Sequence, residues 1–282
     1  MTNTLVVDPS FDANITTSYF LSIRSSSDGL SFCVLDPVVN TYIAYANFPY
    51  DQKDEHGAKT QELLLTEELL NMPYKKVLFM TESQHATLVP TALYSKTKHK
   101  ELLNLCHTEA GEELEILGHK IKMADAWNLF SIPKFMYHLV KNQFENVNFY
   151  QQYSPFVESS LISGQNMKSK HIFHIGLHDS FFDIVVIESR HLKLCNSFRY
   201  SNENDFIYFV LFTFEQLKLP PDETVIHMHG INNRQNPYYL ILKKYLRQTQ
   251  TAAIGTHFQY SHSLKDIIKE KHHNLFNLAI CV

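Results

Sequence analysis

Residues 170–206 read KHIFHIGLHDSFFDIVVIESRHLKLCNSFRYSNENDF, and this stretch decides the fold. Apolar side chains dominate 171–188 and alternate with polar ones over 192–200, which predicts two strands followed by a third. Residues 203–219 are apolar nearly all round and predict a buried helix. A strand at 224–230 and a helix that begins at Pro237 complete the unit.

The first half of the chain shows the same order of elements. Two strands surround Asp28-Gly29 over 19–36, because this dipeptide favours a hairpin turn. A strand at 42–48, a helix at 57–71, a strand at 75–80 and a helix from Pro90 follow. Phe20 corresponds to Ile172 at a separation of 152 residues, and Pro90 corresponds to Pro237. The sequence therefore predicts an internal duplication.

The two halves are unequal. We expect a first lobe at 1–165, with an insertion at about 106–146 that begins with a hairpin at 113–130, and a second lobe at 166–282. The second lobe ends with a strand near 252–260 and a helical segment from Ser263 that is rich in His and Lys. Because that segment is charged, we expect His272 and His273 to be exposed.

Composition excludes several classes of protein. The 282 residues carry a formal charge of −4, so no basic field for nucleic acid is present. Four scattered cysteines form neither a zinc motif nor a disulfide framework. The N-terminus lacks the pattern of a secretory signal, and the longest apolar run is far too short to span a membrane. We expect a cytoplasmic protein that folds without metal or disulfide.

Glycine is scarce, with eight residues in the chain and no two of them close together. Loops that wrap phosphate with backbone N–H groups need clustered glycines, and neither GxGxxG nor GxxxxGK[ST] occurs. A Gly-rich phosphate loop is therefore excluded.

A three-stranded meander followed by helix, strand and helix, present twice, resembles the duplicated ribonuclease-H-like lobes of the actin, sugar-kinase and Hsp70 ATPase superfamily. The chain is most similar to an uncharacterised bacterial family of that actin-like fold, a domain of unknown function. The resemblance implies an α/β fold of two mixed five-stranded sheets flanked by helices. It implies no catalytic residue.

The nucleotide motifs of that superfamily are degraded here. The second phosphate hairpin should run into Asp-x-Gly-Gly-Gly-Thr, but in His174-Ile175-Gly176-Leu177-His178 only Gly176 fits. The adenosine-contacting Gly-Gly pair is reduced to Gly230. The first hairpin should carry an aspartate near the end of its first strand, but Arg24 and three serines follow there, with Asp28 in the turn. Gly176 and Gly230 are thus the remaining candidates for a degenerate nucleotide cleft.

Histidines suggest a metal site as an alternative. Strand alternation puts His174 and His178 on one face and removes His171 from the cluster. His227 and His229 also share a face of one strand, a spacing that suits zinc or iron ligation. The first and fourth strands of such a lobe lie side by side, so the four side chains are candidate ligands in the cleft between the lobes. Buried histidines that fill the place of a lost nucleotide are the other interpretation.

These observations favour a noncatalytic actin-like protein that acts through protein–protein contacts, as a scaffold or regulator, with no cofactor. The alternatives are a metal-binding module or metal-dependent enzyme that uses the histidine cluster, and a weak ATP binder without hydrolysis. The sequence does not name the protein partner.

Overall fold

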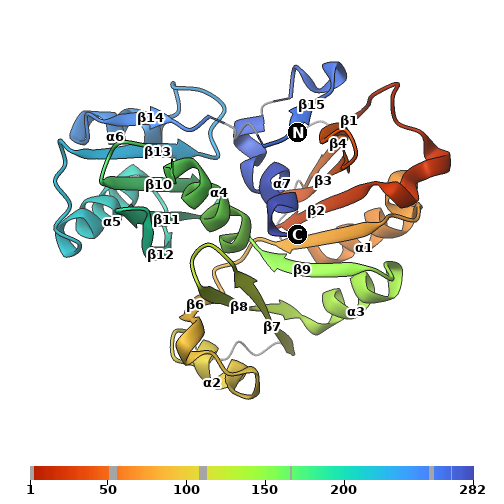
Figure 1. Ribbon diagram of the computed structural model, residues 1–282, viewed down its shortest axis with the longest axis horizontal. Coiled ribbons are helices and arrows are strands. Elements are labelled where there is room, and N and C mark those ends of the chain that lie inside the picture. The colour runs from red at the N-terminus through yellow and green to blue at the C-terminus, as the bar shows by residue number, and fades with distance from the viewer. Residues whose placement is uncertain (1–2, 51–55, 108–112, 166, 254–256, 268) are drawn as a thin grey trace.

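The computed structural model describes residues 3–50, 56–107, 113–165, 167–253, 257–267 and 269–282, and these form two lobes and a small third sheet (Figure 1). The first sheet has the order β1-β4-β3-β2-β5-β9, with β15 also beside β4. The second sheet has the order β12-β11-β10-β13-β14, and the third has the order β6-β8-β7. The bounds are β1 (Thr4–Val7), β2 (Phe20–Ser26), β3 (Gly29–Asp36), β4 (Thr41–Pro49), β5 (Lys76–Thr81), β6 (Ala86–Pro90), β7 (Leu114–Ile121), β8 (Ala126–Pro133), β9 (Val147–Gln151), β10 (His171–Leu177), β11 (Phe181–Glu188), β12 (His191–Arg199), β13 (Thr224–His229), β14 (Thr249–Thr251) and β15 (Gln259–Tyr260).

Helices cover the faces of the two large sheets, and α4 crosses from the first lobe to the second (Figure 1). The α-helices are α1 (His56–Thr66), α2 (His99–Asn104), α3 (Lys134–Gln143), α4 (Tyr153–Gln165), α5 (Glu203–Gln216), α6 (Pro237–Tyr245) and α7 (His273–Asn277). Short 3-10 helices are η1 (Ala13–Ser18), η3 (Glu68–Asn71), η4 (Thr91–Leu93), η5 (Lys96–Lys98), η6 (His262–Leu264), η7 (Lys269–His272) and η8 (Leu278–Cys281). None of the helices in the described part of the chain is long and apolar enough to cross a membrane.

The registers of the two large sheets agree with an internal duplication. β2 and β3 pair antiparallel as β10 and β11 do, and β5 lies parallel to β2 as β13 lies parallel to β10. Each lobe carries an irregularity at the same place, between Val34 and Leu35 in one and between Val186 and Ile187 in the other. A shared irregularity of this kind is more specific than shared alternation, because bulges are fixed features of a fold.

The predicted equivalence of Pro90 and Pro237 is wrong. Pro90 ends strand β6 and is followed by the short 3-10 helix η4 in place of the expected long helix. Pro133 instead directly precedes α3, which leads into β9 as α6 leads into β14. Proline is tolerated both at strand ends and at the start of a helix, so its position alone does not identify the element. The small sheet starts at β6, so the segment added to the first lobe begins earlier than the expected residue 106.

The C-terminal segment is not exposed as we expected. His272 and His273 are 9% and 4% exposed, and β15 pairs with β4 of the first sheet. The apolar side chains of the segment explain this position, because Phe276 is fully buried against the rings of Tyr42 and Tyr45. The division of the chain into lobes at residue 165 stays a prediction, although this C-terminal segment contacts the first sheet.

Candidate functional site

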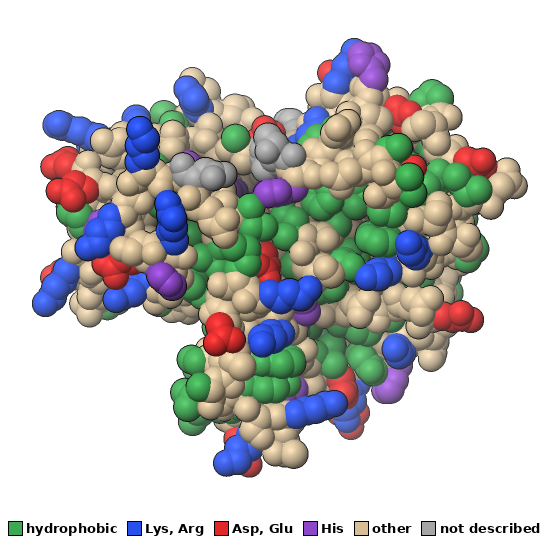
Figure 2. Space-filling view, in the orientation of Figure 1, with side chains coloured by type: hydrophobic (Ala, Val, Ile, Leu, Met, Phe, Trp, Pro, Cys, Tyr) green, Lys and Arg blue, Asp and Glu red, His purple; other side chains and the backbone are tan. Residues whose placement is uncertain are grey.

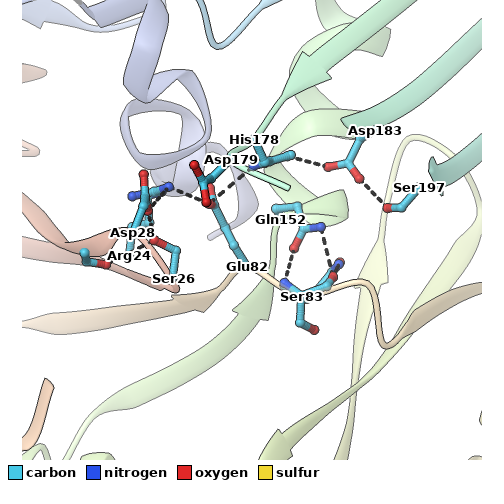
Figure 3. A network of polar contacts seen from close by, with 12 residues as sticks. Arg24, Ser26, Asp28, Glu82, Ser83, Gln152, His178, Asp179, Asp183 and Ser197 are labelled. Atoms are coloured by element: carbon cyan, nitrogen blue, oxygen red, sulfur yellow. Dashed lines mark hydrogen bonds and ion pairs between the residues drawn. The ribbon is translucent and has the colours of Figure 1, made fainter. Parts of the chain in front are cut away.

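Charged side chains from both lobes meet where the β2–β3 hairpin faces the end of β10 (Figure 3). Arg24 of β2 donates through Nη2 to Oδ1 of Asp28 at 2.9 Å and to Oε2 of Glu82 at 2.6 Å. His178, which follows β10, places Nδ1 at 3.3 Å from the same Glu82 oxygen. Glu82 therefore receives a cation from each lobe, and the pair with His178 links the two lobes directly.

The ion pairs keep their charges although they are buried. Burial disfavours the charged form of Glu82, but Arg24 and His178 outweigh it and hold the pKa of this carboxyl well below its usual range. Burial likewise opposes charge on Arg24, and the adjacent carboxylates of Glu82 and Asp28 raise its pKa instead. Breaking such a pair leaves an uncompensated buried charge, which is strongly destabilising.

His178 is held as an imidazolium. Its Nε2 lies 2.8 Å from Oδ2 of Asp183, a fully buried residue of β11, and its other nitrogen faces Glu82. Burial alone would lower the pKa of His178, but the two carboxylates raise it to about 10. The other oxygen of Asp183 accepts a hydrogen bond from the hydroxyl of Ser197 on β12. His178 is therefore a fixed cation at neutral pH.

The loop that carries Glu82 is fixed by two glutamines. The backbone N–H of Ser83 donates to Oε1 of Gln152 at 3.0 Å, and the carbonyl of Ser83 accepts from the side-chain amides of Gln151 and Gln152 at 2.7 and 3.0 Å (Figure 3). Both glutamines are fully buried. Ser83, the residue directly after Glu82, is thus fixed through both its N–H and its carbonyl, and the N–H of Glu82 donates to the carbonyl of Ser25 at 3.0 Å.

The space directly between the two hairpins is small. A cavity of about 20 Å³ lies between Arg24, Glu82 and His178 and the C-terminal residues 271–275. It lies next to a hollow of about 200 Å³ that is lined by Asp28, Gly230 and Lys271 among others. Ligand pockets for small molecules measure roughly 300–1,000 Å³. Protein side chains therefore fill most of the space between the two hairpins.

Gly176 and Gly230 both face protein groups. A Cβ atom at Gly176 would lie 3.2 Å from the ring of Phe156, a residue of α4. Gly230 has a φ of +81°, and a Cβ there would lie 2.3 Å from the carbonyl oxygen of Leu177. Its N–H donates to the carbonyl of Glu270 at 3.1 Å. The backbone at Gly230 therefore requires glycine, whereas Gly176 is only tightly packed against Phe156, and the role of both in a nucleotide cleft stays a prediction.

Three of the four candidate metal ligands come together, and His178 lies apart from them in the ion-pair network. Nδ1 of His174 lies 3.0 Å from Nε2 of His229, and the ring of His174 stacks on that of His227 at 5.0 Å. The sequence missed a further member, since the ring of His273 lies 4.8 Å from that of His229. Burial first, and then the neighbouring histidines, keep the pKa of His174 and His229 well below the usual value.

These histidines are neutral, and some of their nitrogens lack partners. Nε2 of His174 and both ring nitrogens of His273 are buried without a hydrogen-bond partner among the described residues. Within the same residues, no group of three or more His, Cys, Asp or Glu side chains is arranged to hold a metal ion. The metal site therefore stays a prediction.

Sequence reasoning missed Glu82 and the pairing role of Arg24. Arg24 was noticed only as a residue in the place of an acid, and Glu82 follows a buried strand without any motif around it. The one sequence signal for both Arg24 and Glu82 is a charged side chain near the end of an apolar strand. Nothing in the sequence indicated that His178 would reach Glu82 across the lobes.

Comparisons with known proteins now identify the fold. The family described as "Protein of unknown function (DUF3822)" matches residues 8–249, and no curated protein matches the chain. A crystal structure from Bacteroides thetaiotaomicron VPI-5482, described as a protein with actin-like ATPase fold and unknown function, is 22% identical with a TM-score of 0.80, covering 93% of this chain and 98% of that one. A chain of the PilM–PilN type IV pilus biogenesis complex is 10% identical with a TM-score of 0.58, covering 93% and 96%. The predicted actin-like fold with ribonuclease-H-like lobes is confirmed. The expected five strands are found in the second sheet, but the first sheet has seven, because β1 and β15 add to β4.

Proposed function

Since the chain belongs to the family described as DUF3822 and has an actin-like fold, we propose that it is a noncatalytic protein that acts through contacts with another protein. One observation carries this proposal. The buried ion-pair network of Arg24, Glu82 and His178 fills the position between the two hairpins where the superfamily holds phosphate.

Two features of the network argue against phosphoryl chemistry. Hydrolysis of a nucleotide needs a magnesium-linked acid and donors around the phosphates. Glu82 is the acid at this position, and its carboxylate is already shared by Arg24 and His178. Asp28 is likewise paired with Arg24, and it accepts the hydroxyl of Ser26. Binding Mg²⁺ through these carboxylates would take Glu82 away from two buried cations, Arg24 and His178.

Protein contact as the mode of action has a precedent in the same fold. The solved PilM–PilN structure is a complex between two proteins, one of which has this fold. We place our chain in the cytoplasm, in contact with a protein partner, and we expect neither nucleic acid nor a membrane span among its contacts.

Weak nucleotide binding without hydrolysis is the second candidate. The hollow of about 200 Å³ supports it, because Arg24, His178 and Lys271 line it and could attract an anion. Its volume is below that of a typical small-molecule pocket, so a bound nucleotide would have to displace side chains.

The metal-binding module is the third candidate, and the unpartnered nitrogens of His174 and His273 favour it. Elemental analysis of chelator-free protein tests it. Bound transition metal that is lost in His174→Ala, and kept in His191→Ala at an exposed site, would support it.

Calorimetry with ATP and Mg²⁺, followed by a phosphate-release assay, tests the leading proposal. We expect neither stoichiometric heat nor release of phosphate. Tight binding with turnover would overturn it, and saturable binding without turnover would favour the second candidate.

A further inference from the structure

Strand β12 leaves an edge of the second sheet open. It pairs with β11 on one side, and no strand in the described parts of the chain pairs with it on the other side. Its side chains are half-buried or exposed, whereas those of β11 are almost all buried. In Figure 1, β12 lies at the margin of the second lobe, on the side toward the small sheet.

The duplication shows what covers the equivalent edge in the first lobe. β4 holds the place of β12 there, and its outer side carries β1 antiparallel and β15 parallel. Because both lobes share the same bulge, the registers correspond residue by residue. Asn47 pairs with Ser31 as Ser197 pairs with Asp183, so Ser197 is the equivalent of Asn47. Asn47 is the residue that faces Thr4 of β1.

The backbone at this position of β12 presents a hydrogen-bond donor. The N–H of Ser197 donates at 2.9 Å to the side-chain oxygen of Asn196, the exposed residue before it, and not to β11. In an antiparallel strand, the N–H groups of successive residues point alternately toward the paired strand and away from it. The N–H groups of Cys195 and Arg199 therefore point away from β11, as that of Ser197 does. Because Asn196 is exposed, its side chain can rotate away from the N–H of Ser197 at little cost in free energy. The edge therefore offers a row of donors that one added strand could use.

The chemistry around the edge indicates what kind of strand fits. The segment His191–Arg199 carries the exposed cations Lys193 and Arg199 and no acidic residue. Lys193 lies 3.3 Å from Glu188 of β11 in an exposed pair, and Arg199 donates to the neutral side chain of Gln84, so the edge keeps an excess of positive charge. Figure 2 shows further Lys and Arg side chains on the second lobe. Leu194 and Phe198 are partly buried and pack against the core of this lobe. Basic side chains repel another basic strand and attract an acidic one.

We propose that β12 accepts an extended segment of a partner protein as an additional antiparallel strand, with apolar side chains that alternate with acidic ones. β1 on β4 is the built example within this chain, with the apolar sequence TLVV. The proposal rests on the proposed function, since it names the surface and the chemistry of the partner. Main-chain hydrogen bonds supply the affinity in such strand additions, and the alternate side chains supply specificity.

A designed peptide tests the proposal with the protein unaltered. The probe is a capped peptide in which valine alternates with glutamate, titrated into the ¹⁵N-labelled full chain. We expect saturable shifts of the amide signals of β12, centred on Leu194–Ser197. Two further peptides carry methyl groups on every second backbone nitrogen, one on the odd and one on the even positions. One of them should bind at least tenfold more weakly and the other as well as the parent peptide, because only one of the two sets of N–H groups faces β12.

Charge reversal supplies the second readout. Lys193→Glu should weaken binding of the acidic peptide by about tenfold, because a repulsion replaces an attraction. This change in affinity corresponds to about 1.4 kcal/mol of binding free energy. Lys141→Glu, at an exposed lysine of α3, is the matched control and should leave it unchanged. Shifts confined to β4, equal binding of the two methylated peptides, or no binding would overturn the strand addition. None of these results affects the nucleotide calorimetry, so the two proposals fail separately.

Discussion

Replacing Glu82 by glutamine should lower the free energy of unfolding by about 3 kcal/mol while it preserves the shape of the site. Glutamine keeps the size of glutamate but not the charge that lies 2.6 Å from Arg24 and 3.3 Å from His178. Removing one partner from a buried pair typically costs about 3–5 kcal/mol. The lower end applies here, because Asp28 stays with Arg24 and Asp183 stays with His178.

The same substitution should change how stability depends on pH. The pKa of His178 is raised to about 10 in the folded protein, above the value of about 6.5 in an unfolded chain. Its stabilisation is therefore complete below pH 6.5 and is lost as the pH rises toward 10. In Glu82→Gln one of the two carboxylates that raise this pKa is gone. The loss of stability should then still begin near pH 6.5, which the unfolded chain sets, but end at lower pH than in the wild type.

Chemical denaturation at pH 7 and at pH 9 measures both effects. Glu158→Gln is the control, because Glu158 is buried but accepts its hydrogen bond from the backbone N–H of Lys122 at 2.8 Å and needs no charge. We expect that control to stay within about 1 kcal/mol of the wild type at pH 7. If Glu82→Gln costs no more than Glu158→Gln, and its pH profile matches the wild type, the ion-pair network does not hold the lobes as described.

Three further predictions concern packing and the histidines. Lowering the pH below 6.5 should reduce the free energy of unfolding, because burial lowers the pKa of His273 to about 3, so the unfolded chain takes up a proton that the folded protein does not. Denaturation curves of His273→Phe should therefore depend less on pH in this range. Gly230→Ala should cost about 3 kcal/mol, since its φ of +81° and the carbonyl of Leu177 exclude a Cβ, whereas Gly164→Ala in α4 should stay within about 1 kcal/mol by the same measurement. Phe276→Ala should lower the free energy of unfolding by about 4 kcal/mol, and an unchanged denaturation midpoint would contradict the burial of the C-terminal segment.

Local patterns predicted the hairpin strands of both lobes because each pattern has a direct physical cause. They did not predict β1, and the strand expected near 252–260 is replaced by β14 before it and β15 at its end, with residues 254–256 outside the described ones. The Asp28-Gly29 turn lies between β2 and β3 as expected, and the apolar run around Ile184 forms the buried strand β11. The repeat assignment was wrong at Pro90, because proline stands both at the start of a helix, as Pro237 does in α6, and at the end of a strand, as Pro90 does in β6. The bounds of an insertion depend on which strands pair with each other, and local sequence patterns do not determine strand pairing.

The C-terminal segment was misjudged from its charges. Lys271 and its histidine neighbours suggested an exposed face, but Leu275 and Phe276 follow at once and are fully buried. The burial of these two side chains draws His272 and His273 into the protein as well. A mixed segment of this kind is decided by the surface it meets, which only the fold supplies.

The sequence itself shows which residues of the nucleotide motifs are absent. Loss of the acid from the second hairpin was read directly from His174, and loss of the glycines from Gly176 and Gly230. What fills the position was not predictable, because Glu82 and His178 belong to different lobes and no spacing in the sequence relates them.

The most direct test of a permanently filled phosphate position is the ¹⁵N spectrum of the His178 side chain with and without excess ATP and Mg²⁺. Two protonated ring nitrogens at neutral pH, with signals that nucleotide does not move, are the predicted result, since Glu82 and Asp183 already hold this imidazolium from both sides. A neutral ring, or signals that shift and saturate with added nucleotide, would contradict it, because phosphate would then reach the position that Glu82 occupies.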